Sequence, residues 1–191
     1  EVMLWDARTR KPRDARQALA ASIQFASVLP GGQTILAGTT NGAWSVIDLA
    51  TLHETHLPIS ARDSSAFRPP NFLGTYDGNN RFRLYEVAAS GLRLLQELSA
   101  GPASSADFAY FPQKRLLAWT EGSQTIQIAS LDEPAKRTIL TNDIAVNPVN
   151  FGGDGRFLLA TSRPSGQRVR TAVVWNLTTH KVGARKLFGD Q

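Results

Sequence analysis

Residues Arg156 to Thr179, RFLLATSRPSGQRVRTAVVWNLTT, carry the pattern that decides the fold. Two apolar runs, Phe157 to Ala160 and Thr171 to Leu177, are rich in β-branched and aromatic residues and flank a turn that contains Pro and Gly. Short runs of this composition between turn-forming residues are typical of paired β-strands. A second turn, Gly152 to Gly155, precedes the first run, so the stretch predicts three strands joined by two turns.

Weaker copies of this unit recur upstream. Phenylalanines that precede a turn stand 42, 41 and 43 residues apart, at Phe25, Phe67, Phe108 and Phe151. The ends of the third strands recur at a similar interval, at Trp5, Ile47, Tyr85, Ala129 and Trp175. A repeat of about 40 residues is the length of one four-stranded propeller blade. The sequence therefore predicts an all-β chain built as a β-propeller segment of antiparallel blades.

The repeat also sets the expected organisation of the chain. Residues 1–191 form a single propeller segment with full blades at 22–58, 64–98, 105–140 and 145–188, and residues 1–20 supply the last hairpin of a preceding blade. Because the chain begins at the third strand of a blade, we expect an open part of a larger propeller of about seven blades.

These residues resemble the WD-repeat β-propeller family over nearly the whole chain. The matching features are the Asp154-Gly155-Arg156 turn, the small residues Ala37-Gly38-Thr39 and Ala160-Thr161-Ser162, and the strand ends Trp5-Asp6, Ile47-Asp48 and Trp175-Asn176. The Gly-His pair that this family places before its first strand is absent, so a related propeller family with Asp-Gly-Arg turns stays an alternative. The resemblance implies degenerate blades whose rim and central face bind peptides or other domains.

Composition agrees with a globular β protein and narrows its chemistry. The chain has 191 residues, of which 42% are hydrophobic and 19% charged, so it can bury a sizeable core. No window approaches the roughly 20 apolar residues of a membrane span, so no membrane association is expected. The absence of cysteine excludes disulfides and thiolate catalysis. It does not choose between the cytoplasm and the periplasm, so the compartment stays open.

The net charge of +5 raises the question of a nucleic-acid partner. The basic residues near the start of the chain are Arg8, Arg10, Lys11, Arg13 and Arg16. No aromatic residues or Gly-rich backbone are interleaved with them, so a solvated loop is favoured over a phosphate-binding surface. Nucleic acid is therefore not expected as a partner, and strongly salt-dependent binding to DNA or RNA would indicate the alternative.

Two short segments invite a metal-binding interpretation, and both are better explained as structure. The histidines of His53-Glu54-Thr55-His56 stand three residues apart and would point to opposite faces of a strand. The segment Asp77-Gly78-Asn79-Asn80 lacks the length and the final glutamate of an EF-hand loop. No metal or cofactor is therefore expected. No catalytic motif occurs either, although a site assembled from several blades would escape a motif search.

Two features are candidate binding sites. The longest hairpin between the second and third strands of a blade carries Arg163 and Arg168 and is followed by Arg170, three guanidiniums that could grip a carboxylate or phosphate. A solvated hairpin is the alternative. Trp119 stands where other blades carry Gly38 and Thr161, and it is expected either to fill a gap in the core or to line a central ligand channel.

The function expected from these observations is that of a non-catalytic scaffold for protein interaction or sensing, within a larger multidomain protein. A protein or peptide partner is expected, and a small-molecule ligand stays open. The alternatives are a hydrolase or lactonase propeller with a site on the central axis, and a nucleic-acid-binding propeller. The scaffold hypothesis rests on analogy of fold.

Overall fold

The structure of the chain, a computed structural model, describes residues 2–6, 8–17, 22–59, 64–77, 79–99, 107–162 and 170–188. At residues 2–6, 13–17, 64, 149 and 170 it describes the backbone alone. The chain divides into two compact units. The first comprises Glu1–Asp63 with Glu86–Arg93, and the second comprises Ser64–Tyr85 with Leu94–Gln191.

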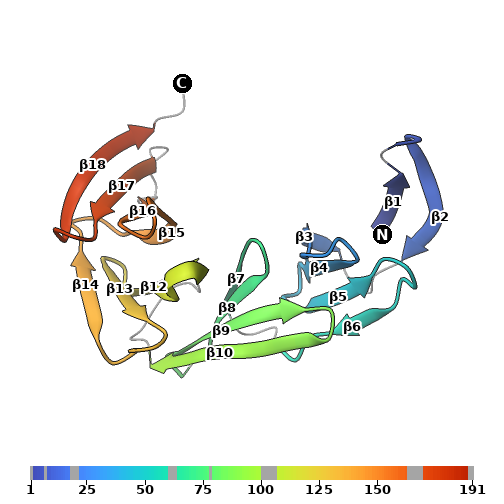
Figure 1. Cartoon of the computed structure of the whole chain (residues 1–191), viewed down its shortest axis with the longest axis horizontal. Coiled ribbons are helices and arrows are strands. Elements are labelled where there is room, and N and C mark those ends of the chain that lie inside the picture. The colour runs from blue at the N-terminus through green and yellow to red at the C-terminus, as the bar shows by residue number, and fades with distance from the viewer. Residues whose placement is uncertain are drawn as a thin grey trace. The chain divides into compact units, whose positions relative to one another are not determined.

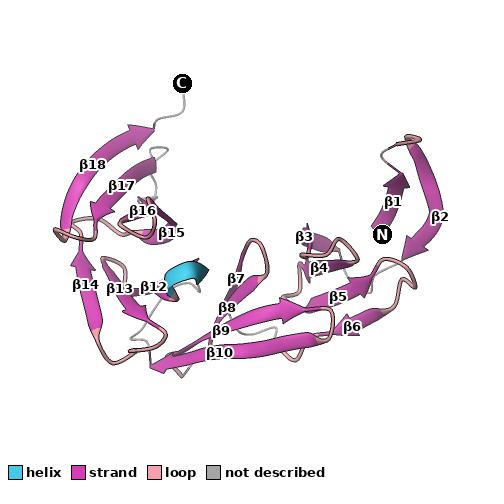
Figure 2. Cartoon of the chain, viewed as in Figure 1, coloured by secondary structure: helices cyan, strands magenta, loops and turns pink. Residues whose placement is uncertain are grey.

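The described residues are all-β (Figure 2), with eighteen strands and one short 3₁₀ helix, η1 (Pro112–Lys114), and no α-helix. Within these ranges no helix has the length and apolar character needed to cross a membrane. Sixteen of the strands form four antiparallel sheets of four, each built from strands consecutive in the chain. The predicted all-β class and its four-stranded antiparallel units are confirmed.

The first unit contains a two-stranded hairpin and one complete sheet (Figure 1). The hairpin joins β1 (Val2–Asp6) to β2 (Lys11–Gln17), with Val2 opposite Gln17. The sheet consists of β3 (Ile23–Val28), β4 (Thr34–Thr39), β5 (Trp44–Asp48) and β6 (Glu54–His56). Its small core contains Ile35, Ala37 and Ile47, with Leu49 packed against them.

Three further sheets follow in chain order. The first consists of β7 (Ser64–Arg68), β8 (Phe72–Tyr76), β9 (Arg81–Ala88) and β10 (Gly91–Ser99). The second consists of β11 (Phe108–Phe111), β12 (Leu116–Glu121), β13 (Thr125–Ser130) and β14 (Arg137–Thr141). The third consists of β15 (Asn147–Gly152), β16 (Phe157–Ser162), β17 (Arg170–Asn176) and β18 (Lys181–Phe188).

The recurring polar residue at the end of the third strand caps the turn that follows. Asp48 Oδ1 accepts hydrogen bonds from the backbone N–H groups of Ala50 and Thr51, at 2.9 and 2.8 Å. Asn176 Oδ1 accepts equivalent bonds from Thr178 and Thr179, at 2.9 and 3.2 Å. Asp and Asn side chains favour turns because they satisfy backbone donors in this way. The repeated Ile-Asp and Trp-Asn pairs therefore mark strand ends for a local reason.

The leucine directly after the third strand gives the alignment of three sheets. The N–H groups of Leu49, Leu131 and Leu177 donate to the carbonyls of Gln33, Arg115 and Arg156, at 2.9, 2.8 and 2.8 Å respectively. Counting four residues onward from these acceptors aligns Trp119 with Ala37 and Ala160. Trp119 is thus one residue out of phase with Gly38 and Thr161, the positions expected from the sequence. On a strand, one residue changes the face to which a side chain points.

The four repeated phenylalanines all lie on the first strands of their sheets, at two different phases. Phe108 and Phe151 lie opposite Trp119 and Leu158, which belong to buried clusters on the same faces. Phe25 instead lies opposite Gly38, on the other face of its sheet from Ala37. A register shift between Ile23 and Phe25 accompanies this difference. Phe25 is half-buried and contacts Trp44, with ring centroids 5.8 Å apart.

A hydrophobic cluster joins the sheets β7–β10 and β11–β14. Phe82 and Leu84 from β9 pack in it with Phe108, Leu117 and Trp119. Gly74 on β8 permits the close approach, because a Cβ atom there would lie 2.6 Å from the Phe108 ring and 2.9 Å from Phe82. On β9 the buried residues Phe82 and Leu84 alternate with less buried neighbours, as is typical of a half-buried strand.

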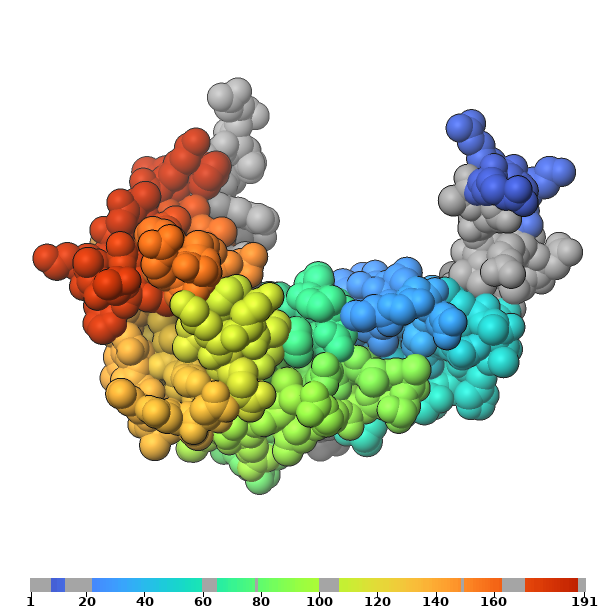
Figure 3. Space-filling view, viewed as in Figure 1, coloured from blue at the N-terminus to red at the C-terminus, as the bar shows by residue number. Residues whose placement is uncertain are grey.

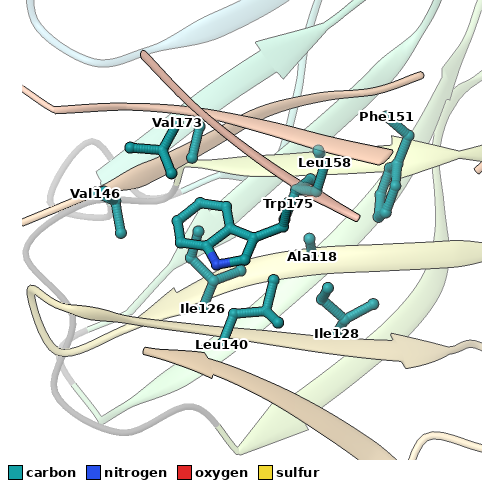
Figure 4. Packing of buried hydrophobic residues seen from close by; sticks show 11 residues of the cluster. Ala118, Ile126, Ile128, Leu140, Val146, Phe151, Leu158, Val173 and Trp175 are labelled. Carbon is teal, nitrogen blue, oxygen red and sulfur yellow. The ribbon is translucent and has the colours of Figure 1, made fainter. Parts of the chain in front are cut away.

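A second cluster joins the sheets β11–β14 and β15–β18, whose atoms lie directly against each other (Figure 3). Figure 4 shows the Trp175 ring between residues of both sheets, with Ile126 and Leu140 on one side and Val173 close by. Trp175 is only 2% exposed. Burial of a large aromatic side chain contributes strongly to stability, so Trp175 anchors this pair of sheets.

A buried carboxylate holds the turn between β8 and β9. Asp77 Oδ1 accepts hydrogen bonds from the N–H groups of Asn79 and Arg81, at 2.9 and 3.0 Å. Its Oδ2 lies 3.1 Å from both Arg81 Nε and Arg83 Nη2. Burial raises the pKa of Asp77, but these backbone bonds and the two arginine charges outweigh it, so the pKa lies below its ordinary value. This segment therefore serves as a structural turn.

Candidate functional site

The predicted arginine hairpin lies largely outside the described residues. Arg163 and Arg168 fall in 163–169, and Arg170 is described only as a backbone position at the start of β17. Recognition of an anion by this hairpin therefore stays a prediction.

Trp119, the other predicted binding residue, lies in the core between β7–β10 and β11–β14. Its side chain is 1% exposed, and the guanidinium carbon of Arg137 lies 5.3 Å from its ring centroid. The indole Nε1 is buried and has no hydrogen-bond partner. This environment matches the core-filling interpretation of Trp119, and its role in ligand binding stays untested.

A pocket of about 420 Å³ lies among the first strands of three consecutive sheets of the second unit. Its lining residues are Phe67, Arg68, Pro69, Tyr110 and Asn150. Phe67 and Arg68 end β7, Tyr110 lies in β11, and Asn150 lies in β15. We call it the first-strand pocket. Its residues come from three segments that are 40 or more positions apart in sequence, and these segments meet because equivalent strands of successive sheets adjoin.

Arg68 is held rigidly at this pocket. Its Nε donates to the carbonyl oxygen of Phe108 at 2.8 Å, and its Nη1 donates to the carbonyl of Phe67 at 3.1 Å. Its Nη2 donates to Asp107 Oδ1 at 3.2 Å. A guanidinium carries five N–H donors, so these bonds leave two for an acceptor on a ligand. The side chain is therefore pre-organised to bind an oxygen atom.

The other lining residues supply an aromatic surface and an amide. The half-buried Tyr110 ring meets Phe72 edge-on, with centroids 4.7 Å apart and planes at 74°. Asn150 is exposed and can both donate and accept hydrogen bonds. Aromatic residues and arginine are the types most enriched where proteins bind one another. Neither a carboxylate nor a histidine is among the described residues that line the pocket.

The first unit carries a smaller pocket of about 230 Å³ beside the cap of β5. Asp48 and His53 line it with three threonines, Val46 and Ala89. Hydrogen bonds from the Thr51 backbone and hydroxyl lower the pKa of Asp48 below its ordinary value. These bonds already occupy the carboxylate in the turn. Among the described residues, no three His, Asp or Glu side chains are grouped as metal ligands would be.

The first-strand pocket was not predicted from the sequence, and none of Arg68, Tyr110 and Asn150 was a candidate site residue. A usable signal was present: Arg68 and Asn150 lie within one residue of the repeated phenylalanines Phe67 and Phe151. Polar residues at equivalent repeat positions lie on equivalent strands. Their side chains are therefore expected to lie near one another where these strands adjoin.

Comparison with known proteins bears on the fold alone. No protein-family model and no curated protein sequence matches the chain. Two similar solved structures are hydrazine synthase from Kuenenia stuttgartiensis, at TM-score 0.59 and 12% identity, and a chain of a nidogen/laminin complex, at 0.58 and 14%. They cover 92% and 98% of this chain. The chain spans 53% of the hydrazine synthase chain and 74% of the other. The architecture is therefore propeller-like.

Proposed function

We propose that this chain is a non-catalytic protein-interaction scaffold whose first-strand pocket binds an extended segment of a partner protein. In this proposal an oxygen acceptor of the partner meets Arg68, and an apolar side chain packs on Tyr110. The observation that carries it is the fixed orientation of Arg68 in a pocket with aromatic and amide neighbours. Pre-organised arginine and aromatic side chains lower the cost of binding.

The similarity to a chain of a nidogen/laminin complex supports the same proposal. That structure is titled as a complex between two proteins, and its chain shares the propeller-like fold at 14% identity. Propellers place loops and first strands on a rigid scaffold, which suits recognition. The analogy is one of fold and does not identify the partner.

The blades of this scaffold are proposed to be degenerate WD-like units of a larger propeller, of about seven blades, in a multidomain protein. The capped turns after Asp48 and Asn176 support this interpretation, because they give the WD-like strand ends a shared structural role. This proposal predicts that a closed propeller ring requires blades in addition to the four described sheets.

The test is selection of peptides on the immobilised chain from a random display library, followed by fluorescence anisotropy with the selected peptides. Replacing Asn150 by Arg should lower affinity about tenfold, equivalent to roughly 1.4 kcal/mol, because a bulky cation would enter the pocket. Asn79→Arg is the matched control, since Asn79 is an exposed asparagine in the β8–β9 turn.

Peptides that bind the wild-type and Asn150→Arg proteins equally would refute the pocket as the site. Turnover of generic ester or lactone substrates, abolished by the same substitution, would refute the scaffold and favour a hydrolase. Binding of DNA that falls steeply with salt would favour the nucleic-acid alternative.

A further inference from the structure

A second, chemically different cavity lies between the sheets β11–β14 and β15–β18. It has a volume of about 300 Å³. The residues that line it are Lys114, Leu116, Ile128, Thr138, Gly155, Arg156, Leu177, Thr178 and His180. All belong to the second unit, and they share no residue with the first-strand pocket. We call it the basic cleft.

The lining of the basic cleft combines apolar and hydroxyl-bearing side chains. Leu116 and Leu177 are partly buried and pack against the cluster between the two sheets, and Ile128 is a buried member of that cluster. Thr138 on β14 and Thr178 in the β17–β18 turn add hydroxyl groups. A partner that fits this lining must present an apolar surface.

Three basic side chains line the same cleft, and no Asp or Glu is among the lining residues that the structure describes. Lys114 ends η1, Arg156 ends the β15–β16 turn, and His180 lies between β17 and β18. All three are exposed. Arg156 Nε donates to Asp154 Oδ1 at 2.8 Å and approaches the Gly153 carbonyl at 3.3 Å. These contacts use Nε alone and leave the two Nη groups for a ligand.

The turn that carries Arg156 has a left-handed backbone at three residues. Gly153, Asp154 and Gly155 all have positive φ, at 56°, 58° and 83°. A Cβ atom at Gly155 would lie 3.0 Å from Phe111 and 3.3 Å from Leu116, so this turn packs directly on the core. Glycine is needed where the backbone is left-handed and in close contact. The guanidinium of Arg156 is thereby attached to a fixed point beside the apolar lining.

From this juxtaposition we propose that the basic cleft binds an acidic, extended segment of a partner protein, with acidic and apolar residues in alternation. Acidic side chains of the segment pair with Lys114 and Arg156, and an apolar neighbour packs against Leu116 and Leu177. A volume near the lower end of the range for ligand sites, roughly 300 to 1,000 Å³, suits side chains rather than a large cofactor.

The observations favour a peptide over other anions. A free phosphate would leave the apolar lining unused, and among the described lining residues no Phe, Tyr or Trp offers a ring on which a nucleic-acid base could stack. This inference adds a second site to the proposed scaffold. It does not depend on the first-strand pocket, and either site can fail alone.

The experiment measures fluorescence anisotropy of a labelled peptide of alternating glutamate and leucine at moderate salt. Lys114→Gln combined with Arg156→Gln should lower its affinity at least about tenfold. Lys136→Gln combined with Lys181→Gln is the matched control, because it also removes two positive charges, but from exposed sites outside the cleft. The control should change affinity less than about twofold. Thermal midpoints by circular dichroism verify that both double variants fold.

Two comparison probes complete the test. A peptide of alternating glutamate and serine should bind about tenfold more weakly than the glutamate–leucine peptide, because it cannot use the apolar lining. Inorganic phosphate, added at constant total ionic strength, should not displace the labelled peptide. Equal loss in both double variants, equal binding of the serine peptide, or displacement by phosphate would each overturn the proposal.

Discussion

Arg68 and Phe108 are linked in two ways across two neighbouring sheets. Arg68 Nε donates to the Phe108 carbonyl oxygen at 2.8 Å, and the guanidinium carbon lies 5.5 Å from the centroid of the same residue's ring. One side chain on β7 thus contacts both the backbone and the ring of a residue on β11. The link joins the wall of the first-strand pocket to the core beneath it.

Replacing Arg68 by Gln should lower the free energy of unfolding by about 1 to 3 kcal/mol, because it removes the charged bond to Asp107 and the cation–π contact. Urea unfolding followed by tryptophan fluorescence measures this. Arg68→Lys keeps the charge but lacks the planar fork, so it should recover less than half of the loss. Full recovery by lysine would show that charge alone matters.

Asp77→Asn should destabilise the protein at neutral pH and have little effect in acid. The pKa of Asp77 is lowered in the folded state, so its ionised form contributes stability above the unfolded-state pKa, about 4. That contribution is lost as the pH falls through the lower folded-state pKa. At pH 7 we expect a loss of about 1 to 3 kcal/mol in urea unfolding, because Arg83 would lose a charged partner.

Asp154→Asn is the control for this comparison of unfolding free energies at different pH values. Asp154→Asn removes an exposed carboxylate that also pairs with an arginine, and it should change stability by less than about 0.5 kcal/mol at any pH. A gap between the wild-type and Asp77→Asn proteins that persists unchanged below pH 3 would contradict the ionic explanation.

Gly74→Ala should destabilise the core between β7–β10 and β11–β14 by about 1 to 3 kcal/mol, because the added methyl would overlap the Phe108 ring. Gly152→Ala is a matched control on β15, where an added Cβ meets nothing within 4 Å. It should be neutral within about 0.5 kcal/mol. Equal midpoints for both variants in urea would show that Phe108 moves aside freely.

The repeated phenylalanines should not be equivalent in stability. Phe108→Ala, at a site with 0% exposure, should lower the free energy of unfolding by about 3 to 5 kcal/mol. Phe25→Ala, at a half-buried site of different phase, should lose clearly less. Urea unfolding of the two variants measures the difference. Losses of the same size would contradict the phase assigned to Phe25.

Local features of the fold could be predicted from the sequence, because they depend on adjacent residues. The Asp48 and Asn176 caps lie two or three residues from the donors they bind, so the repeated strand ends were visible in the chain. Alternation along β9 was likewise readable from Arg81 to Val87. Periods of two and of about 40 residues therefore predicted the strands and their grouping into sheets.

Features that depend on phase and on distant contacts could not be predicted. The alignment of Trp119 with the other sheets is set by the hydrogen bond from the Leu131 N–H to the Arg115 carbonyl. An alignment error of one residue assigns its side chain to the other face of the sheet. The pair formed by Arg68 and Asp107 joins residues 39 positions apart. Neither the first-strand pocket nor the basic cleft has a motif, because each is assembled from several strands and turns.

The contact between Gly74 and the Phe108 ring makes the order of the sheets a property of the chain itself. Gly74 on β8 leaves room for the bulky Phe108 ring from β11. At another aligned core position, two sheets carry the small residues Ala37 and Ala160, and a third carries the large Trp119. A recombinant in which residues 64–99 and 147–188 exchanged places would separate Gly74 from the Phe108 ring that it accommodates. The sheets β7–β10 and β15–β18 are therefore not interchangeable, and a swap would require a compensating change at Phe108.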